Sequence, residues 1–157
     1  MKLRSLATSL LTAGLLLSTL GCSKKDDPTI LSTGSYKLDG AARNCQTKAY
    51  VSSSSSGGLT YDYLEVDLTT TPAPASGAEV LKLYYQKSGG QPANAYVLNG
   101  IELSAKGSTI SFANNVSTLN TTSGNGYSGT FSATAIRSNP PPPYSAITDG
   151  AFTDARL

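Results

Sequence analysis

Short apolar alternations with a period of two, separated by turn residues, constrain the fold of this chain most. Leu64, Val66 and Leu68 would share one side of a strand. The residues between and before them would share the other side: Tyr61, Tyr63, Glu65 and Asp67. No segment offers a convincing apolar stripe at helical spacing. We therefore expect an all-β domain over residues 34–157, an antiparallel β-sandwich or, as the alternative, a β-barrel.

Turn residues predict where the strands end. Asn99-Gly100 lies between two short apolar stretches and predicts a hairpin, because both central residues of a tight turn need positive φ. The Ser/Gly run 52–58 predicts a flexible, solvent-facing loop. Asp149-Gly150 predicts a break in the last strand, which we place at 146–156.

The N-terminal residues 1–21 have the three parts of an export signal. Lys2 and Arg4 give a positive start, an apolar stretch follows from Leu6 to Leu20, and the small residue Gly21 precedes Cys22. The stretch is diluted by serine and threonine and falls short of the roughly 20 apolar residues that a spanning helix needs. An export signal is therefore favoured over a membrane span.

Leu17-Ser18-Thr19-Leu20-Gly21-Cys22 resembles the lipobox of bacterial lipoproteins. The resemblance implies that a diacylglycerol is attached to the sulfur of Cys22 and that the chain is cleaved in front of it. The sequence departs from the usual pattern at Thr19, where leucine is typical. The alternative is an ordinary signal peptide followed by an incidental cysteine.

Residues 22–33 are polar and contain proline, which is typical of a flexible tether between a lipid and a domain. Within it, Lys24, Lys25, Asp26 and Asp27 resemble the surface-export signal of Bacteroidota lipoproteins. That resemblance implies a lipid-anchored protein of the outer membrane, exposed at the cell surface. The alternative is a solvated linker with no signalling role.

Removal of residues 1–21 would leave ten basic and ten acidic residues, because Lys2 and Arg4 are two of the 12 basic residues and all 10 acidic residues lie further on. A neutral mature chain has no electrostatic footprint for nucleic acid.

Lipidation of Cys22 would leave Cys45 without a partner inside the chain. We expect Cys45 to be buried as a small hydrophobe.

The sequence argues against an enzyme. Histidine is absent, which removes the commonest catalytic base and the commonest metal ligand. The carboxylates are scattered, so a carboxylate-dependent hydrolase is only the third hypothesis. Asp149 and Asp154 are the one candidate pair for calcium, but Asp-Gly is first a turn signal. We expect no catalytic residue, no metal site and no cofactor.

Tyrosine is the most suggestive residue type, with nine copies and no tryptophan. Tyr61, Tyr63 and Tyr84, together with Tyr50 or Tyr96, could form an aromatic platform on one sheet face for a glycan or a protein. The alternative is that tyrosine is simply a good strand former that gains from cross-strand pairing.

The C-terminal residues 127–133 (YSGTFSA) and 147–152 (ITDGAF) resemble the ending of small Bacteroidota lipoproteins, whose domains are β-sandwiches of largely unknown function. The resemblance supports the fold and the cell-envelope address and carries no catalytic residue. The leading hypothesis is a non-catalytic, lipid-anchored surface protein that binds glycan or protein through its tyrosine face. The runner-up is a purely structural envelope lipoprotein with no small ligand.

Overall fold

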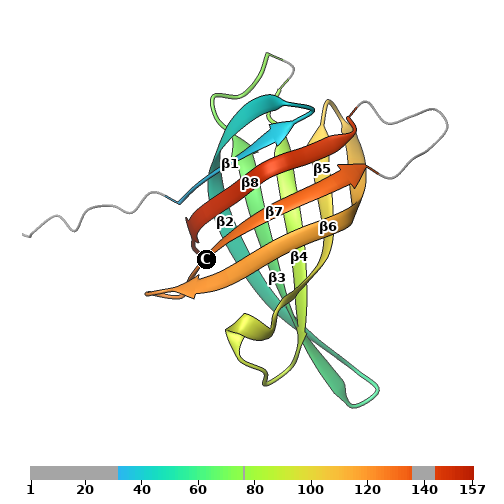
Figure 1. Ribbon diagram of the computed structural model, residues 1–157. Coiled ribbons are helices and arrows are strands. Elements are labelled where there is room, and N and C mark those ends of the chain that lie inside the picture. The colour runs from blue at the N-terminus through green and yellow to red at the C-terminus, as the bar shows by residue number, and fades with distance from the viewer. Residues whose placement is uncertain (1–31, 76, 136–143) are drawn as a thin grey trace, which may run out of the picture.

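The computed structural model describes residues 32–75, 77–135 and 144–157, which form eight strands and one short 3-10 helix (Figure 1). The elements in chain order are β1 (Thr33–Leu38), β2 (Ala41–Ser56), β3 (Leu59–Thr70), β4 (Val80–Ser88), η1 (Ala93–Ala95), β5 (Val97–Ala105), β6 (Ser108–Thr122), β7 (Gly126–Ala135) and β8 (Ala146–Ala155).

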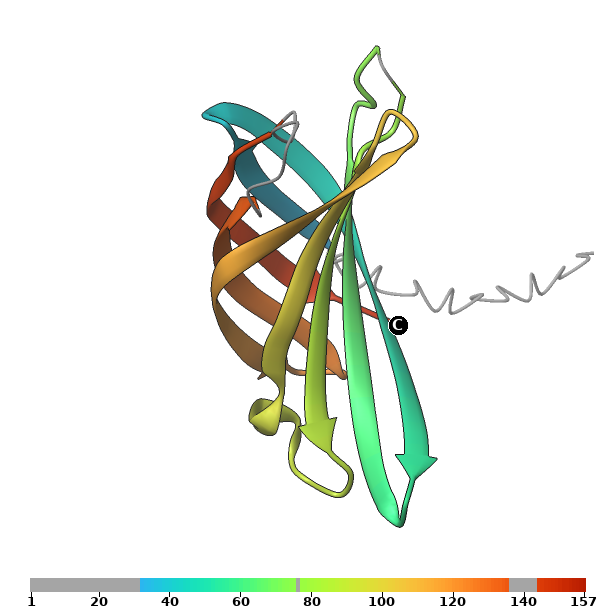
Figure 2. The same cartoon turned by 90° about the vertical axis from the view of Figure 1, so that its right-hand side faces the viewer.

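The strands form a closed antiparallel barrel. Each strand pairs with the next one along the chain, and β8 returns to pair with β1, where Gly34 lies opposite Phe152. The views in Figures 1 and 2 show the strands wrapping around one interior. The all-β prediction is confirmed. Of the two arrangements expected from the sequence, the barrel forms, because pairing of β8 with β1 leaves no separate second sheet.

Apolar side chains fill the barrel interior. Leu64, Val66 and Leu68 of β3 point inward and are almost fully buried, as the period-two alternation predicts. On β4 the same pattern buries Leu81, Leu83 and Tyr85. The other six strands supply the rest of the core, which includes Tyr36, Leu38, Ile101, Leu103, Phe112, Phe131, Ile147 and Phe152.

The hairpin predicted at Asn99-Gly100 is wrong. Strand β5 runs straight through both residues, with Gly100 opposite Tyr84 and Leu98 opposite Tyr85, so that Asn99 is the extra residue of a β-bulge. The turn comes later, at Lys106-Gly107, where φ is 52° and 77°. Both positive values suit the tight turns that join antiparallel strands. The turn preference of Asn99-Gly100 is overridden because the residues on both sides of this dipeptide pair with the same strand, β4.

The prediction of a flexible loop over residues 52–58 is also wrong, because the loop is much shorter. Ser52 to Ser56 belong to β2 and pair with β3, from Ser52 opposite Tyr63 to Ser56 opposite Leu59. Only Gly57-Gly58 forms the turn, with φ of 59° and 80°. The serines are strand residues because their backbone groups pair across the hairpin, which weak side-chain preference does not prevent.

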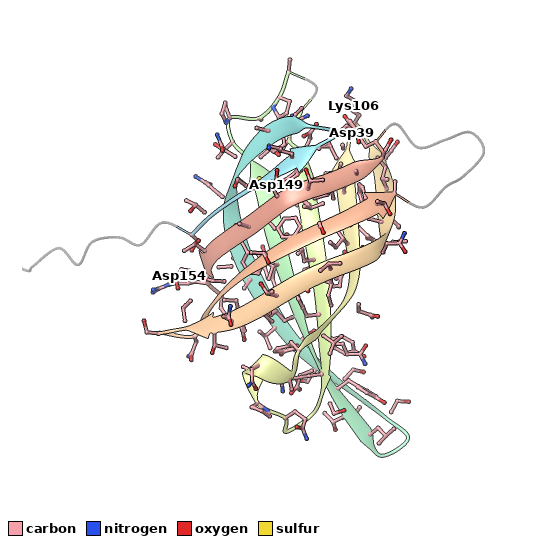
Figure 3. The ribbon with its side chains drawn as sticks, in the orientation of Figure 1. Asp39, Lys106, Asp149 and Asp154 are labelled. Atoms are coloured by element: carbon pink, nitrogen blue, oxygen red, sulfur yellow. The ribbon has the colours of Figure 1, made fainter. Side chains whose placement is uncertain are left out.

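Strand β8 is not broken at Asp149-Gly150 but continues from Ala146 to Ala155. Asp149 has a φ of 51° and forms a bulge where β8 passes the β7 segment between Phe131 and Ala133. Asp154 has a φ of 50° at a second irregularity of the same pairing. Figure 3 labels both aspartates on β8, together with the turn residues Asp39 and Lys106.

Two aromatic rings occupy space that glycines leave free. A side chain at Gly150 would overlap the ring of Phe131, and a Cβ atom at Gly129 would lie 2.9 Å from Cζ of Phe152. The two rings are themselves neighbours, with centroids 6.4 Å apart. The seam between β7 and β8 therefore depends on glycine for close packing rather than for an unusual backbone conformation.

We expect Gly129→Ala to destabilise the barrel by about 3 kcal/mol, at the upper end of what overpacking costs. Its Cβ atom would overlap the carbonyl oxygen of Thr118 as well as the Phe152 ring, and backbone cannot move aside as a flexible side chain can. Urea unfolding would measure the change. Gly100→Ala is the matched control, because its Cβ atom would meet only Tyr84 Cδ2 at 4.0 Å. Equal stability of the two variants would contradict this account.

Candidate functional site

The outer faces of β2, β3 and β4 bring three tyrosines together. Tyr50 of β2 lies opposite Glu65 of β3, and Glu65 lies opposite Tyr84 of β4. Tyr63 is two residues before Glu65 on the same face of β3. Their neighbours along each strand, such as Leu64 and Tyr85, point into the core. Strand alternation and register thus place all three rings outside the barrel.

These tyrosines line a shallow hollow of about 270 Å³. We call it the tyrosine hollow, and its lining consists of Tyr50, Ser52, Tyr63, Leu64, Glu65, Tyr84, Tyr85 and Asn99. Tyr50 is 45% exposed and Tyr63 is 37% exposed, so both rings are accessible to a ligand. Tyr84 is half-buried.

The bulge on β5 helps to build the tyrosine hollow. Asn99, its extra residue, lines the hollow with a side-chain amide. Gly100 has no side chain, and even a Cβ atom there would only reach van der Waals contact with Tyr84. The dipeptide that looked like a turn therefore contributes a polar group and the space beside an aromatic ring.

A row of alternating charges across four strands borders the tyrosine hollow and consists of Lys48, Asp67, Lys82 and Glu102. Lys82 of β4 donates to Glu65 and lies 3.6 Å from an oxygen of Asp67. Burial, followed by the neighbouring carboxylate of Glu65, raises the pKa of Asp67 to about 6. Lys48 lies across from Asp67 on β2, and its Nζ stands 5.0 Å from the centre of the Tyr50 ring. The cations of the row thus touch both the carboxylates and an aromatic face.

Tyr84 also contacts this row through its hydroxyl group, which donates to Glu102 over 3.4 Å. Burial, followed by the charge of Glu102, raises the pKa of Tyr84 above its ordinary value. The phenol is therefore neutral at physiological pH and can act as a hydrogen-bond donor.

The three predicted tyrosines do not all share one hollow. Tyr63 and Tyr84 lie together, but Tyr61 lies further along β3 and lines a second hollow of about 370 Å³ with Gln86, Ser88 and Val97, among others. Tyr50, an optional member of the predicted platform, lines the tyrosine hollow. Tyr96, the other option, is buried, with its ring edge-on to Tyr127.

Another hollow, of about 710 Å³, lies over β1, β2 and β8. Its lining is small and uncharged, and includes Thr33, Ser35, Asn44, Gln46 and Thr153. It has no aromatic ring to give a ligand a flat apolar surface. The tyrosine hollow is smaller but has the more specific chemistry.

A polar cluster lies beside the apolar core and consists of Tyr36, Arg43, Cys45 and Glu79. Glu79 is 2% exposed, and Arg43 Nε donates to its Oε2 over 2.7 Å. Cys45, in the same cluster, is buried, as predicted. Burial raises the pKa of the Cys45 thiol to about 11 and that of Tyr36 to about 12. Both groups are protonated at neutral pH, so Cys45 is a poor nucleophile.

The candidate calcium ligands are not brought together. Asp149 pairs with Lys37 over 2.8 Å, whereas Asp154 accepts hydrogen bonds from Thr122 and Arg156. Figure 3 shows the two aspartates at different places along β8. Within residues 32–75, 77–135 and 144–157, no three histidine, cysteine, aspartate or glutamate side chains are grouped so that they could hold a metal ion.

Cys22 and the segment Lys24, Lys25, Asp26 and Asp27 lie outside the described residues. In the part of the chain that the structure describes, no helix is both long and apolar enough to cross a membrane. Comparison with known proteins found no match to a family model, to a curated protein or to a solved structure.

Proposed function

We propose that this chain is a non-catalytic, lipid-anchored protein of the cell envelope that binds a glycan at the tyrosine hollow. The observation that carries the proposal is the gathering of Tyr50, Tyr63 and Tyr84 from three adjacent strands around Glu65 and Asn99. Aromatic rings offer flat apolar faces, and a few polar groups between them fix the orientation of a ligand.

The chemistry of the tyrosine hollow suits a sugar ring. A sugar presents C–H groups on its faces and hydroxyl groups at its edge, so it can stack on Tyr63 or Tyr84 while it hydrogen-bonds to Asn99 or Glu65. The volume of about 270 Å³ is just below the range of roughly 300–1,000 Å³ typical of small-molecule sites. The hollow therefore suits a single sugar unit.

The cell-envelope address rests on the N-terminal sequence. The lipobox-like residues 17–22 support lipidation at Cys22, and the run from Lys24 to Asp27 supports export to the outer face of the outer membrane. The absence of histidine from the sequence and the protonated state of Cys45 support a binding role rather than catalysis.

A glycan array followed by titration of the strongest ligand tests the binding site. We expect Tyr63→Ala and Tyr84→Ala each to weaken binding about tenfold, which corresponds to roughly 1.4 kcal/mol of lost stacking. Tyr61→Ala is the matched control, because it removes a tyrosine from the same strand face but from the neighbouring hollow. An equal loss in Tyr61→Ala, or no glycan binding by the wild-type chain, would rule out this site.

A further inference from the structure

The hairpin of β2 and β3 extends beyond the rest of the barrel as a two-stranded arm (Figures 1 and 2). Every residue from Tyr50 to Thr60 is exposed, on both faces of the arm. Thr60 and Tyr61 of β3 still have β4 or its following loop beside them, since Tyr61 lies opposite Ser88 and Gly89 N–H donates to the carbonyl of Thr60. The other side of the arm is the outer edge of β2.

Within the part of the chain that the structure describes, hydrogen bonds on that side of β2 reach as far as Ala49. Strand β1 covers β2 from Ala41 to Gln46, and beyond it Thr47 N–H donates to Ser32 and Ala49 N–H donates to Arg156. Within the described ranges (32–75, 77–135 and 144–157), no strand lies beside residues 51–56 on the side away from β3.

Strand alternation identifies the free backbone groups. Because the amides of Thr47 and Ala49 point away from β3, those of Val51, Ser53 and Ser55 point the same way. Asn44 shows that the even-numbered residues of β2 face the other way, since its carbonyl points toward β3 and accepts from Thr71 N–H. Among the described residues, these three N–H groups and three carbonyls therefore form a row along the edge without a strand partner.

This edge has none of the features that normally prevent strand pairing. Native edges are usually blocked by lysine, proline, bulges or inward-pointing charges. Residues 51–59 (VSSSSSGGL) contain no charge and no proline, and the pairing with β3 is regular without a bulge. The apolar side chains of Val51 and Leu59 are 45% and 61% exposed on the same arm.

We propose that the outer edge of β2 pairs antiparallel with the same edge of a second copy of this chain, with the two-fold axis at Ser53. In that register Ser53 faces Ser53 of the second copy, and Val51 faces Ser55. All three free residues of each copy then exchange both backbone hydrogen bonds, which makes six in total. A register centred on Ser52 or Ser54 leaves at least one free residue of each copy without such a partner.

The edge fits a second copy better than another partner for two reasons. It carries no charge, so self-pairing brings no like charges together, and there is no charge to select a different peptide. Its length also fits, because the Gly57 turn of one copy would reach Ala49 of the other, where Arg156 already occupies the edge. Tyr50 and Ser52 of the tyrosine hollow lie on β2, but their backbone groups point toward β3, and Tyr63 and Tyr84 lie on β3 and β4, so self-pairing at the outer edge leaves both rings accessible.

Cysteine substitutions test the register in the full-length chain, extracted from membranes and oxidised under mild conditions. We expect Ser53→Cys to form a disulfide-linked dimer, because the two sulfurs meet on the axis. Val51→Cys and Ser55→Cys should each remain monomeric alone and should cross-link when mixed with one another. The wild-type chain, which keeps Cys22 and the buried Cys45, gives the background.

A second pair of variants separates edge pairing from random collision. Ser55→Pro removes an amide that points to the free edge and spares the bonds to β3, so it should abolish cross-linking of Ser53→Cys. Ser55→Ala keeps the amide and should leave cross-linking unchanged. Absence of a Ser53→Cys dimer, or equal cross-linking at positions 51, 53 and 55, would overturn the proposal. So would a cross-link from Ser53→Cys to a different protein.

Discussion

Replacement of Cys22 by serine is expected to move this protein from the membrane fraction to the soluble fraction. A serine cannot carry the thioether-linked diacylglycerol that the lipobox resemblance implies. Each buried methylene of an acyl chain contributes about 0.8 kcal/mol, and two or more chains hold a protein at a membrane essentially permanently. The expected change is therefore nearly complete, and fractionation followed by detection of the chain measures it.

Cys45→Ser is the matched control, because it removes the other cysteine, which is buried in the barrel. It should leave the membrane association unchanged. Incorporation of a labelled fatty acid into the wild-type chain but not into Cys22→Ser would identify the lipid directly. Membrane association of Cys22→Ser equal to the wild type would show that lipidation is not the anchor.

Replacement of Arg43 by methionine is expected to lower the free energy of unfolding by about 3 kcal/mol. Methionine keeps much of the apolar stem of arginine but removes the guanidinium, which is 2.7 Å from Glu79. Glu79 is 2% exposed and would be left as a buried charge without its cation. Removal of one partner of a buried ion pair typically costs roughly 3–5 kcal/mol. Arg43 is itself partly exposed, which places the expected loss at the lower end.

Two further variants show whether the loss comes from the buried carboxylate. Arg43→Met combined with Glu79→Gln should recover much of the stability, because the amide carries no charge to desolvate. Lys37→Met breaks the ion pair between Lys37 and Asp149. The side chains of this pair are 50% and 67% exposed, so the loss should be much smaller than in Arg43→Met. Urea unfolding compares them. Equal losses in Arg43→Met and Lys37→Met would contradict a structural role for the buried pair.

The regular part of the fold could be predicted from local pattern. Leu64, Val66 and Leu68 alternate with polar or aromatic neighbours, and a strand with that pattern must bury one side. The outward positions of Tyr63 and Tyr84 follow from the same alternation. The turns were predicted less well, because Asn99-Gly100 and Asp149-Gly150 favour positive φ but do not determine whether the result is a hairpin or a bulge.

The candidate site depended on register between strands, which no single segment encodes. Tyr50 joins Tyr63 and Tyr84 because β2 and β4 are aligned on either side of Glu65. Tyr61 is on the same strand face but too far along it to line the same hollow. Asn99 lines the hollow only because β5 bulges past β4. These placements come from pairing between residues that are distant in the sequence.

The sequence by itself determined an all-β domain, its inward-facing residues and, through Cys22, the proposal for its anchor. These properties depend on residue type and on spacings of a few residues, which act locally. Only the tertiary structure decided that the strands close into a barrel, where Gly34 meets Phe152, and that Arg43 neutralises Glu79 from 36 positions away. It also decided that the serines of β2 lie at a strand edge with no partner strand among the described residues. Closure, charge pairing and edges depend on which distant segments lie side by side, because backbone and side-chain groups can bond only to what the whole fold brings near them.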